Sequence, residues 1–303
     1  MPDPFVLHVD GIWYAFATAA GPLEGGSGSR ALRLLRSTDF ERWERCEGPL
    51  VAPPEAVGCS IWAPEVARGD DGRFYLYYSF GREQDQQHRL RVAVSDHPDG
   101  PYEDAGIDLV DPATQPFAID PHPFRDDDGS WWLYYARNFV DQEDGAHVGT
   151  GLVVDRLPSM TRLAGQPTTI LRPRHAWTLF EADRDVAAYG GRFDWHTIEG
   201  PFVEKHAGRY WLTYSGGNYG GPSYGVGVAS AHAPTGPFVG DFASPTLLST
   251  PATGLRGPGH HSITRGPDGR DWIAFHAWDA EATRRQMHLA PLRWDAQAGP
   301  SLA

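Results

Sequence analysis

The chain has 303 residues and a formal net charge of −13, and no cluster of Lys or Arg appears in its acidic sequence. This charge argues against a nucleic acid or an anionic membrane as a partner and favours a neutral one. No apolar segment approaches the roughly 20 residues of a membrane-spanning helix, and the first residues show no signal segment. We therefore expect a protein that is cytoplasmic, or secreted with its leader removed.

The first element is a β-hairpin pattern, and it recurs along the whole chain. Each copy has an apolar strand, a turn with Gly, and a strand rich in aromatic residues. In chain order the copies read DPFVLHVDGIWYAFAT, APEVARGDDGRFYLYYS, DPHPFRDDDGSWWLYYA, EGPFVEKHAGRYWLTYS and HHSITRGPDGRDWIAFHA. Their turn glycines are Gly11, Gly72, Gly129, Gly208 and Gly269, at intervals of 61, 57, 79 and 61 residues. The hairpin is therefore part of a sequence repeat.

Each hairpin is followed by another apolar run and a second turn, such as LRVAVSDHPDGPY after the second copy. A repeat therefore holds about four short strands, which is the content of one propeller blade. No amphipathic helix of ordinary length interrupts the pattern. The sequence predicts an all-β fold, a five-bladed β-propeller with four antiparallel strands per blade, formed by a single domain over residues 1–303.

The longest interval carries an insertion before the fourth hairpin, with the sequence PRHAWTLFEADRDVAAYGGRFDWHT. An insertion at the mouth of a propeller walls off part of a pocket, which favours a substrate bound by its end. The stretch GPLEGGSGSR lacks the context of a phosphate loop and is interpreted as a loop of the first repeat. The two cysteines, Cys46 and Cys59, are expected to be reduced, although one bridge is compatible with the sequence.

Ionisable residues recur at one position of the repeat. Counting nine residues back from the turn glycines reaches Ala63, Asp120, Glu199 and His260, and in the first copy Asp3 lies eight residues back. Equivalent residues of a propeller lie at the same radius and height, so these side chains should converge at one mouth of the channel. Crowded carboxylates shift one another's pKa values, which indicates catalysis. For Asp120 alone, the alternative is that Asp-Pro merely opens a strand.

Five short motifs carry a resemblance to a known family. They read PDPFVL, WAPEV, AIDPHPF, IEGPFV and GPGHHSI, in this order. The chain resembles glycoside hydrolase family 43, whose members are five-bladed propellers that cleave arabinose- and xylose-containing glycans. Related propellers that act on sucrose and fructans have Arg-Asp-Pro and Glu-Cys where this chain has Ile119-Asp120-Pro121 and Glu199-Gly200-Pro201. That relationship is therefore disfavoured.

The resemblance implies a role for each carboxylate. Asp3 would be the general base that activates water, and Glu199 the general acid that protonates the departing oxygen. Asp120 would orient Glu199, modulate its pKa and bind a sugar hydroxyl. In an inverting hydrolase the acid and the base are about 6.5–9.5 Å apart, which leaves room for the water.

A histidine and a cation are also implied by the resemblance. His260 matches a histidine on the propeller axis that is often beside calcium or another cation with a shell of waters. Calcium prefers oxygen ligands, so one imidazole among waters makes a weak site. The alternative is a histidine held only by hydrogen bonds. His261 stands where relatives commonly have asparagine, and no organic cofactor is expected.

Sugar contacts are expected near the channel mouth. Aromatic and polar side chains beside the carboxylates suit stacking or hydrogen bonding, although ordinary packing explains the aromatic ones equally well. The candidates are Trp62, Phe117, Trp195, His196 and Arg285, with Arg284 as the alternative arginine. Glu65, two residues beyond the repeated position, is expected to be structural or to contact the substrate at the rim.

The leading hypothesis is an inverting, exo-acting α-L-arabinofuranosidase that acts on arabinan or arabinoxylan-type glycans. A β-xylosidase and an endo-1,5-α-L-arabinanase are the alternatives in the same family. A propeller that binds carbohydrate without catalysis is the alternative of another class. The expected partner is a neutral oligo- or polysaccharide, and the sequence does not indicate an oligomeric state.

Overall fold

The computed structural model describes residues 1–19, 32–46, 51, 60–82, 87–240 and 242–303. Two predicted features, the loop at 21–30 and Cys59, lie outside these residues. Within the described part strands dominate, and the one α-helix is the short α1 (Thr250–Thr253). None of its helices is long and apolar enough to cross a membrane. The predicted all-β fold is confirmed.

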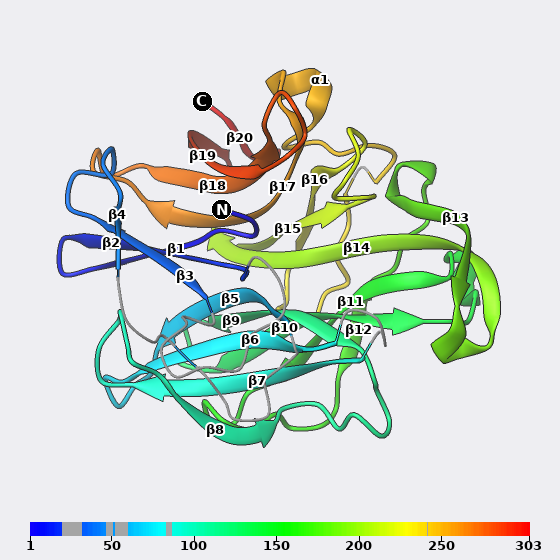
Figure 1. The fold of residues 1–303 in the computed structure, drawn as a ribbon, viewed down its shortest axis with the longest axis horizontal. Coiled ribbons are helices and arrows are strands. Elements are labelled where there is room, and N and C mark those ends of the chain that lie inside the picture. Colours follow the sequence, from blue (N-terminus) through cyan, green and yellow to red (C-terminus); the bar gives the residue numbers. More distant parts are fainter. Residues whose placement is uncertain (20–31, 47–50, 52–59, 83–86, 241) are drawn as a thin grey trace.

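The strands form five successive antiparallel units (Figure 1). The first unit has β1 (Phe5–Val9), β2 (Ile12–Ala17), β3 (Arg33–Ser37) and β4 (Glu44–Arg45). The second has β5 (Ser60–Arg68), β6 (Phe74–Arg82), β7 (Gln87–Ser95) and β8 (Glu103–Asp108). The third has β9 (Ala118–Arg125), β10 (Trp131–Phe139), β11 (Gly149–Arg156) and β12 (Thr168–Leu171). The fourth has β14 (Gly191–His206), β15 (Arg209–Gly216) and β16 (Gly225–Ala231). The fifth has β17 (Arg256–Arg265), β18 (Asp271–Trp278), β19 (Arg285–Asp295) and β20 (Gly299–Leu302).

The first strands of the five units form a closed ring. β1 contacts β5, β5 contacts β9, β9 contacts β14, β14 contacts β17, and β17 contacts β1. This is the arrangement of a propeller, and five units are consistent with the predicted five blades. In Figure 1 the N-terminal end lies between the units, whereas the C-terminus lies at the outer edge beside β20.

The fourth unit differs from the predicted four antiparallel strands. β14, β15 and β16 pair in order, and only two isolated bridges, Val226 with Leu248 and Ser230 with Val239, stand in the place of a fourth strand. The insertion explains a second difference. It forms β13 (Leu179–Val186), which pairs with the extended first part of β14, and β14 also runs parallel to β11 for a short distance. The third and fourth units therefore share one sheet.

Two kinds of turn close the repeated hairpins. In the first and fourth units the turn has two residues, Asp10-Gly11 and Ala207-Gly208, and both residues of each have positive φ. Such turns match the twist of the strands and require residues that tolerate this conformation. In the other three units five residues join the strands, and the turn glycine also has positive φ.

The first and fifth units meet without sharing a sheet. The backbone N–H of Val6 donates to Ser262 Oγ at 3.0 Å, and this hydroxyl donates to the carbonyl oxygen of Pro4 at 3.1 Å. Farther out, Trp13 Nε1 donates to the carbonyl oxygen of Arg265 at 2.8 Å. Side chains therefore hold the ring closed at this junction.

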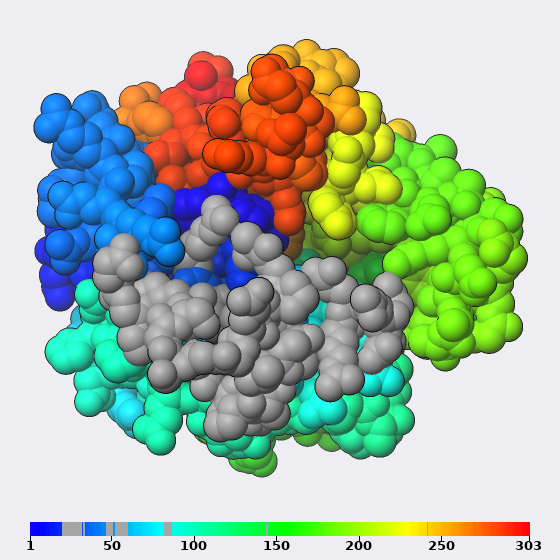
Figure 2. All heavy atoms as spheres, viewed as in Figure 1, coloured from blue at the N-terminus to red at the C-terminus, as the bar shows by residue number. Residues whose placement is uncertain are grey.

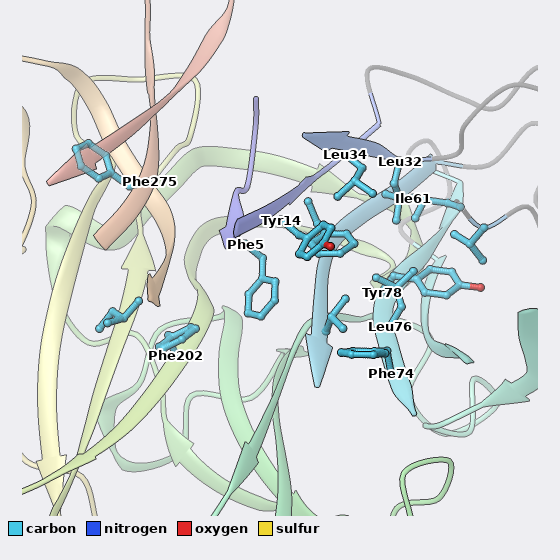
Figure 3. Packing of buried hydrophobic residues seen from close by; sticks show 14 of the residues in the cluster. Phe5, Tyr14, Leu32, Leu34, Ile61, Phe74, Leu76, Tyr78, Phe202 and Phe275 are labelled. Atoms are coloured by element: carbon cyan, nitrogen blue, oxygen red, sulfur yellow. The ribbon is translucent and has the colours of Figure 1, made fainter. Parts of the chain in front are cut away.

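Buried aromatic and aliphatic side chains fill the space between units. Figure 3 shows Phe5, Tyr14, Phe202 and Phe275 in one cluster, which draws on the first, second, fourth and fifth units. Alternation along the strands places such residues on the inner faces of both neighbouring sheets. This packing fixes how the units meet and therefore where the first residues of β1, β5, β9, β14 and β17 lie.

Candidate active site

One cavity collects the predicted ionisable residues. Its volume is about 970 Å³, and its wall includes Asp3, Asp120, Glu199 and His260. These residues lie in or just before the first strands of four different units. Figure 2 shows the dark blue N-terminal residues in the middle of one face, below the orange and red residues of the fifth unit. The cavity size suits a ligand pocket, for which volumes of roughly 300–1,000 Å³ are usual.

One backbone conformation recurs at the cavity. Asp3, Ala63, Asp120 and His260 have φ values of 54°, 43°, 57° and 43°, and the fourth unit has Gly200 in this conformation, at 53°. Positive φ is uncommon for residues other than glycine and marks strained sites, which cluster where ligands bind. In the second, third and fifth units the strand pairing is interrupted at the same place. The irregularity redirects the side chain out of the sheet.

The predicted register of Glu199 is wrong by one residue. Gly200, not Glu199, has the conformation of Asp120, and Glu199 occupies the preceding position, where it pairs with Ser215. The two-residue turn of this hairpin places the equivalent residue eight residues before Gly208, as in the first unit. The carboxyl group of Glu199 nevertheless lines the same cavity.

Side chains of the preceding unit hold this backbone in four of the five units. In each case the N–H of the positive-φ residue donates to a side chain from the end of the preceding unit's second strand. The pairs are Ala63 with Thr18 Oγ1 at 2.9 Å, Asp120 with Ser79 Oγ at 2.9 Å, His260 with Ser215 Oγ at 2.8 Å, and Asp3 with His276 Nδ1 at 3.2 Å. The corresponding residue of the third unit is Ala136, which has no acceptor in its side chain. There the N–H of Gly200 donates to Asp120 Oδ2 at 3.0 Å instead.

Asp3 is surrounded by groups that favour its ionised form. Its Oδ1 lies 3.0 Å from Arg285 Nη1 and 3.5 Å from His260 Nδ1, and Thr18 Oγ1 donates to Oδ2 at 2.5 Å. Burial acts to raise the pKa of Asp3, but the charge of Arg285, followed by His260, lowers it well below its usual value. Asp3 is therefore a carboxylate, which can accept a proton.

Glu199 and Asp120 have the opposite tendency. Burial raises the pKa of both, and the nearby charge of Asp3 adds to the effect. Tyr224 donates its hydroxyl to Glu199 Oε1 at 2.6 Å, which opposes the rise. Asp120 Oδ2 accepts a hydrogen bond from the N–H of Gly200, the residue that directly follows Glu199. The cavity therefore combines one ionised carboxylate with two that bind protons more readily.

His260 lies among these three carboxylates. Burial favours the neutral ring, but Asp3, Asp120 and Glu199 together raise the pKa of His260. An imidazole ligates a metal only in its neutral form, and the described residues contain no group of three or more His, Cys, Asp or Glu side chains suited to one. The cation beside His260 that the resemblance implies, held by one imidazole and a shell of waters, stays a prediction. The adjacent His261 is buried, with Nε2 2.6 Å from Thr213 Oγ1.

Three of the four aromatic or imidazole side chains expected to contact sugar line the cavity. Trp62 stacks on the buried His88 at a centroid distance of 3.7 Å and an interplanar angle of 20°, and Phe117 meets the same imidazole edge-on at 5.7 Å. Trp195 also lines the cavity, below the guanidinium of Arg184. Packing and sugar contact are compatible for the partly exposed Trp62, whereas Trp195 is only 1% exposed and packs in the wall.

His196 and Glu65 do not line this cavity, in contrast to the sugar or rim contacts considered for them. The ring of His196 stacks on His147 at 3.9 Å, and its Nδ1 lies 2.9 Å from Thr178 Oγ1. It faces the inserted segment because it lies in the extended part of β14. Glu65 Oε2 lies 2.7 Å from His122 Nδ1 and joins β5 to β9. Glu65 is thus structural, which was one of its two interpretations.

The inserted segment and the fifth unit form the outer wall. Phe180 and Arg184 from β13 line the cavity together with Tyr219 and Trp278, and Arg285 lies over the ring of Tyr219 at 4.9 Å. The prediction that the insertion contributes to the pocket wall is confirmed. Arg284 lines the same cavity, but of these two arginines the described ion pair with Asp3 belongs to Arg285.

The site residues that were missed in the sequence include Thr18, His276 and Tyr224. His276 occupies in the fifth unit the register position that Ser79 has in the second, so counting along the second strands as well as the first could have found it. Tyr224 comes from the glycine-rich segment between β15 and β16, outside the repeated hairpins, so counting from the turn glycines does not reach it.

The comparisons with known proteins agree with this arrangement. The family model described as glycosyl hydrolases family 43 matches residues 1–300. A solved thermostable family-43 glycoside hydrolase superposes with a TM-score of 0.81 at 27% identity, and the match covers 99% of this chain and 92% of that chain. The architecture and the sequence motifs are therefore those of one family.

Two curated relatives differ in how they act. The extracellular exo-α-(1→5)-L-arabinofuranosidase of Streptomyces chartreusis is 29% identical over 290 residues, covering 91% of this chain and 79% of the relative. The extracellular endo-α-(1→5)-L-arabinanase 2 of Bacillus subtilis is 24% identical over 278 residues, covering 81% of this chain. This chain spans about half of the Bacillus relative, 51% of its length.

Proposed function

The chain belongs to the glycosyl hydrolases of family 43, and from this premise we propose that it is an inverting, exo-acting α-L-arabinofuranosidase. The observation that carries the proposal is one cavity whose wall holds two carboxyl groups with different partners, Arg285 at Asp3 and Tyr224 at Glu199. The pKa of Asp3 is lowered beside Arg285, whereas burial raises the pKa of Glu199. Inverting hydrolysis of a glycoside requires one ionised and one protonated carboxyl group.

Asp3 is the general base of the proposed reaction. Its carboxylate accepts a proton from a water molecule as the water attacks the anomeric carbon. Arg285 and Thr18 fix the two oxygens and keep the group ionised in the free enzyme. A base held in position by fixed partners contributes to the rate because proton transfer needs no rearrangement.

Glu199 is the general acid. It gives its proton to the glycosidic oxygen as the bond to the anomeric carbon breaks, so that the sugar leaves as an alcohol. Asp120 holds the N–H of Gly200 and so fixes the backbone beside Glu199. Asp120 also faces the cavity, where its carboxyl group can bind a sugar hydroxyl.

The wall of the cavity supports attack at chain ends. The space in which a glycan would continue is bounded by Phe180 and Arg184 of the insertion and by the rings of Tyr219 and Trp278 beside Arg285. One curated relative with exo specificity matches along most of its own length, which supports the same choice. Terminal arabinofuranosyl units of arabinan or arabinoxylan are the proposed substrates, with β-xylosides and internal arabinan linkages as the alternatives.

The test is a hydrolysis screen with three substrates, namely nitrophenyl α-L-arabinofuranoside, nitrophenyl β-D-xyloside and linear arabinan. We expect cleavage of the arabinofuranoside and release of arabinose from arabinan ends. Release of oligosaccharides with neither aryl glycoside cleaved would assign endo action instead. Proton NMR of the first product should show the anomer opposite to the substrate; retention of configuration contradicts the roles given to Asp3 and Glu199.

Two variants separate catalysis from mere binding. Asp3→Asn and Glu199→Gln should each lower kcat by about 10² or more on arabino-oligosaccharides, the contribution usual for general acid and base groups. Glu65→Gln changes a buried carboxyl group outside the cavity and should leave kcat within about twofold, a change well below that contribution. If both catalytic variants retain turnover and lose only affinity, the protein is a carbohydrate-binding propeller.

A further inference from the structure

Tyr224 is a buried residue near the cavity, and its one polar side-chain group is the phenol hydroxyl. It is 1% exposed, and its hydroxyl lies 2.6 Å from Glu199 Oε1. Its ring is parallel to that of His276, with an interplanar angle of 8° and a centroid distance of 5.7 Å. His276 in turn contacts Asp3. Tyr224 therefore lies between the acid and the residue that contacts the base.

The space for Tyr224 depends on a glycine of the fifth unit. A Cβ atom at Gly259 would come within 2.3 Å of Tyr224 Cε1, so any larger residue there would displace the ring. Gly259 directly precedes His260, whose ring faces the same carboxylates. The position of the phenol is thus fixed by a close backbone approach, by stacking on His276 and by the hydrogen bond to Glu199.

The direction of the hydrogen bond decides how Glu199 is used. The phenol is buried, and its hydroxyl donates to Oε1. An oxygen that accepts this bond is held in one direction, and the acidic proton belongs on the other oxygen, Oε2. We propose that Tyr224 is a positioning residue that holds Oε1 of Glu199, so that Oε2 carries the proton delivered to the glycosidic oxygen. This inference rests on the proposed function of Glu199 as the acid.

The bond to Tyr224 gains strength during the reaction. When the Oε2–H bond breaks, the proton passes to the glycosidic oxygen, which keeps the electron pair of the broken bond to carbon. Tyr224 retains its own proton throughout. Glu199 becomes a carboxylate, and a hydrogen bond to a charged oxygen is about twice as strong as one to a neutral group. An interaction that strengthens in the transition state raises kcat rather than affinity alone.

The alternative is that Tyr224 only fills the core, and the leaving group of the substrate distinguishes the two roles. Tyr224→Phe keeps the ring and its stacking but removes the hydroxyl. We expect kcat on arabino-oligosaccharides to fall about ten- to hundredfold, the equivalent of a lost hydrogen bond to a charged group. On 2,4-dinitrophenyl arabinofuranoside, whose leaving group departs without a proton, kcat should change less than about threefold, because general acid catalysis is not needed.

Tyr77→Phe is the matched control. Tyr77 is also fully buried, and its hydroxyl donates to the carbonyl oxygen of Met160 at 2.7 Å, away from the cavity. Tyr77→Phe should change kcat by the same factor on arabino-oligosaccharides and on 2,4-dinitrophenyl arabinofuranoside, or should leave both values unchanged. If Tyr224→Phe also lowers both values by the same factor, or lowers neither, the proposal is overturned and Tyr224 is only a packing residue.

A double-mutant cycle tests whether the effect passes through Glu199. In the Glu199→Gln background, Tyr224→Phe should cause no further loss on oligosaccharides, because no acidic proton remains to be placed. An additional ten- to hundredfold loss there contradicts the inference. If Glu199→Gln itself leaves oligosaccharide turnover unchanged, the proposed function fails instead. The two failures therefore give different results.

Discussion

The ion pair between Arg285 and Asp3 gives a prediction about pH. Arg285→Met removes the positive charge that lies 3.0 Å from Asp3 Oδ1 and keeps most of the side-chain volume. An opposite charge at this distance lowers the pKa of a carboxyl group by about 1–3 units. Burial acts to raise the pKa of Asp3 and remains in the variant, so the pKa should rise.

The assay is kcat/KM as a function of pH on nitrophenyl α-L-arabinofuranoside. The base works only when ionised, so the acidic limb of the profile follows the pKa of Asp3 in the free enzyme. We expect this limb to move up by about 1–3 pH units, which corresponds to about 1.4–4 kcal/mol of lost preference for the charged form. Arg284→Met is the control, because Arg284 lines the same cavity without an ion pair to Asp3.

Stability should change in the same variant with a defined sign. The lowered pKa of Asp3 means that its charge stabilises the fold above the unfolded pKa of about 3.9, and that this contribution is lost as pH falls through the folded value. Leaving the buried Asp3 without Arg285 should cost about 3–5 kcal/mol at neutral pH by urea unfolding. An acidic limb that stays in place, or that moves equally in the Arg284 variant, would refute the assignment of Arg285 as the main cause.

Three further predictions concern other contacts. Glu65→Ala leaves the ring of His122 without its carboxylate and should lower the free energy of unfolding by about 3 kcal/mol while kcat/KM is kept, measured by urea unfolding and steady-state kinetics; a large loss of kcat would place Glu65 in the reaction. Gly259→Ala should displace Tyr224 and reduce kcat on arabino-oligosaccharides at least as much as loss of the hydroxyl does; an unchanged kcat contradicts the packing argument. Trp62→Ala should raise KM about tenfold, equivalent to about 1.4 kcal/mol, if the indole stacks on the sugar; an unchanged KM limits Trp62 to packing on its own blade.

The repeat made the fold and the cavity predictable. A hairpin signal depends on a few local residues, such as a turn glycine and alternating apolar positions, and five copies at similar spacing leave few architectures. Asp3, Asp120 and His260 follow from this because their position relative to the turn is set by the strand itself. For these residues, local sequence determines three-dimensional equivalence.

The errors have a different origin. Glu199 was placed one residue out of register because the length of the turn at Gly208 changes the count, and glycine at position 200 conceals the conformation that marks the equivalent residue. His196 was expected at the sugar, but the insertion extends β14, and the imidazole stacks on His147 of the third unit instead. Tyr224 comes from the connection between β15 and β16, outside the repeated hairpins. Contacts made by segments outside the repeat leave no periodic signal.

The junction between the first and fifth units has a consequence for thermal inactivation. Asp3 belongs to the first unit, but its backbone is held by His276 and its carboxylate by Arg285, both from the fifth. The chain does not pass directly from the fifth unit to the first, so non-covalent contacts alone hold this side of the ring. A local opening there would separate Asp3 from its partners while the four other boundaries stay intact. Heating should therefore abolish turnover before circular dichroism detects loss of β-structure, and hydrogen exchange should find the amides of residues 3–9 among the earliest to lose protection.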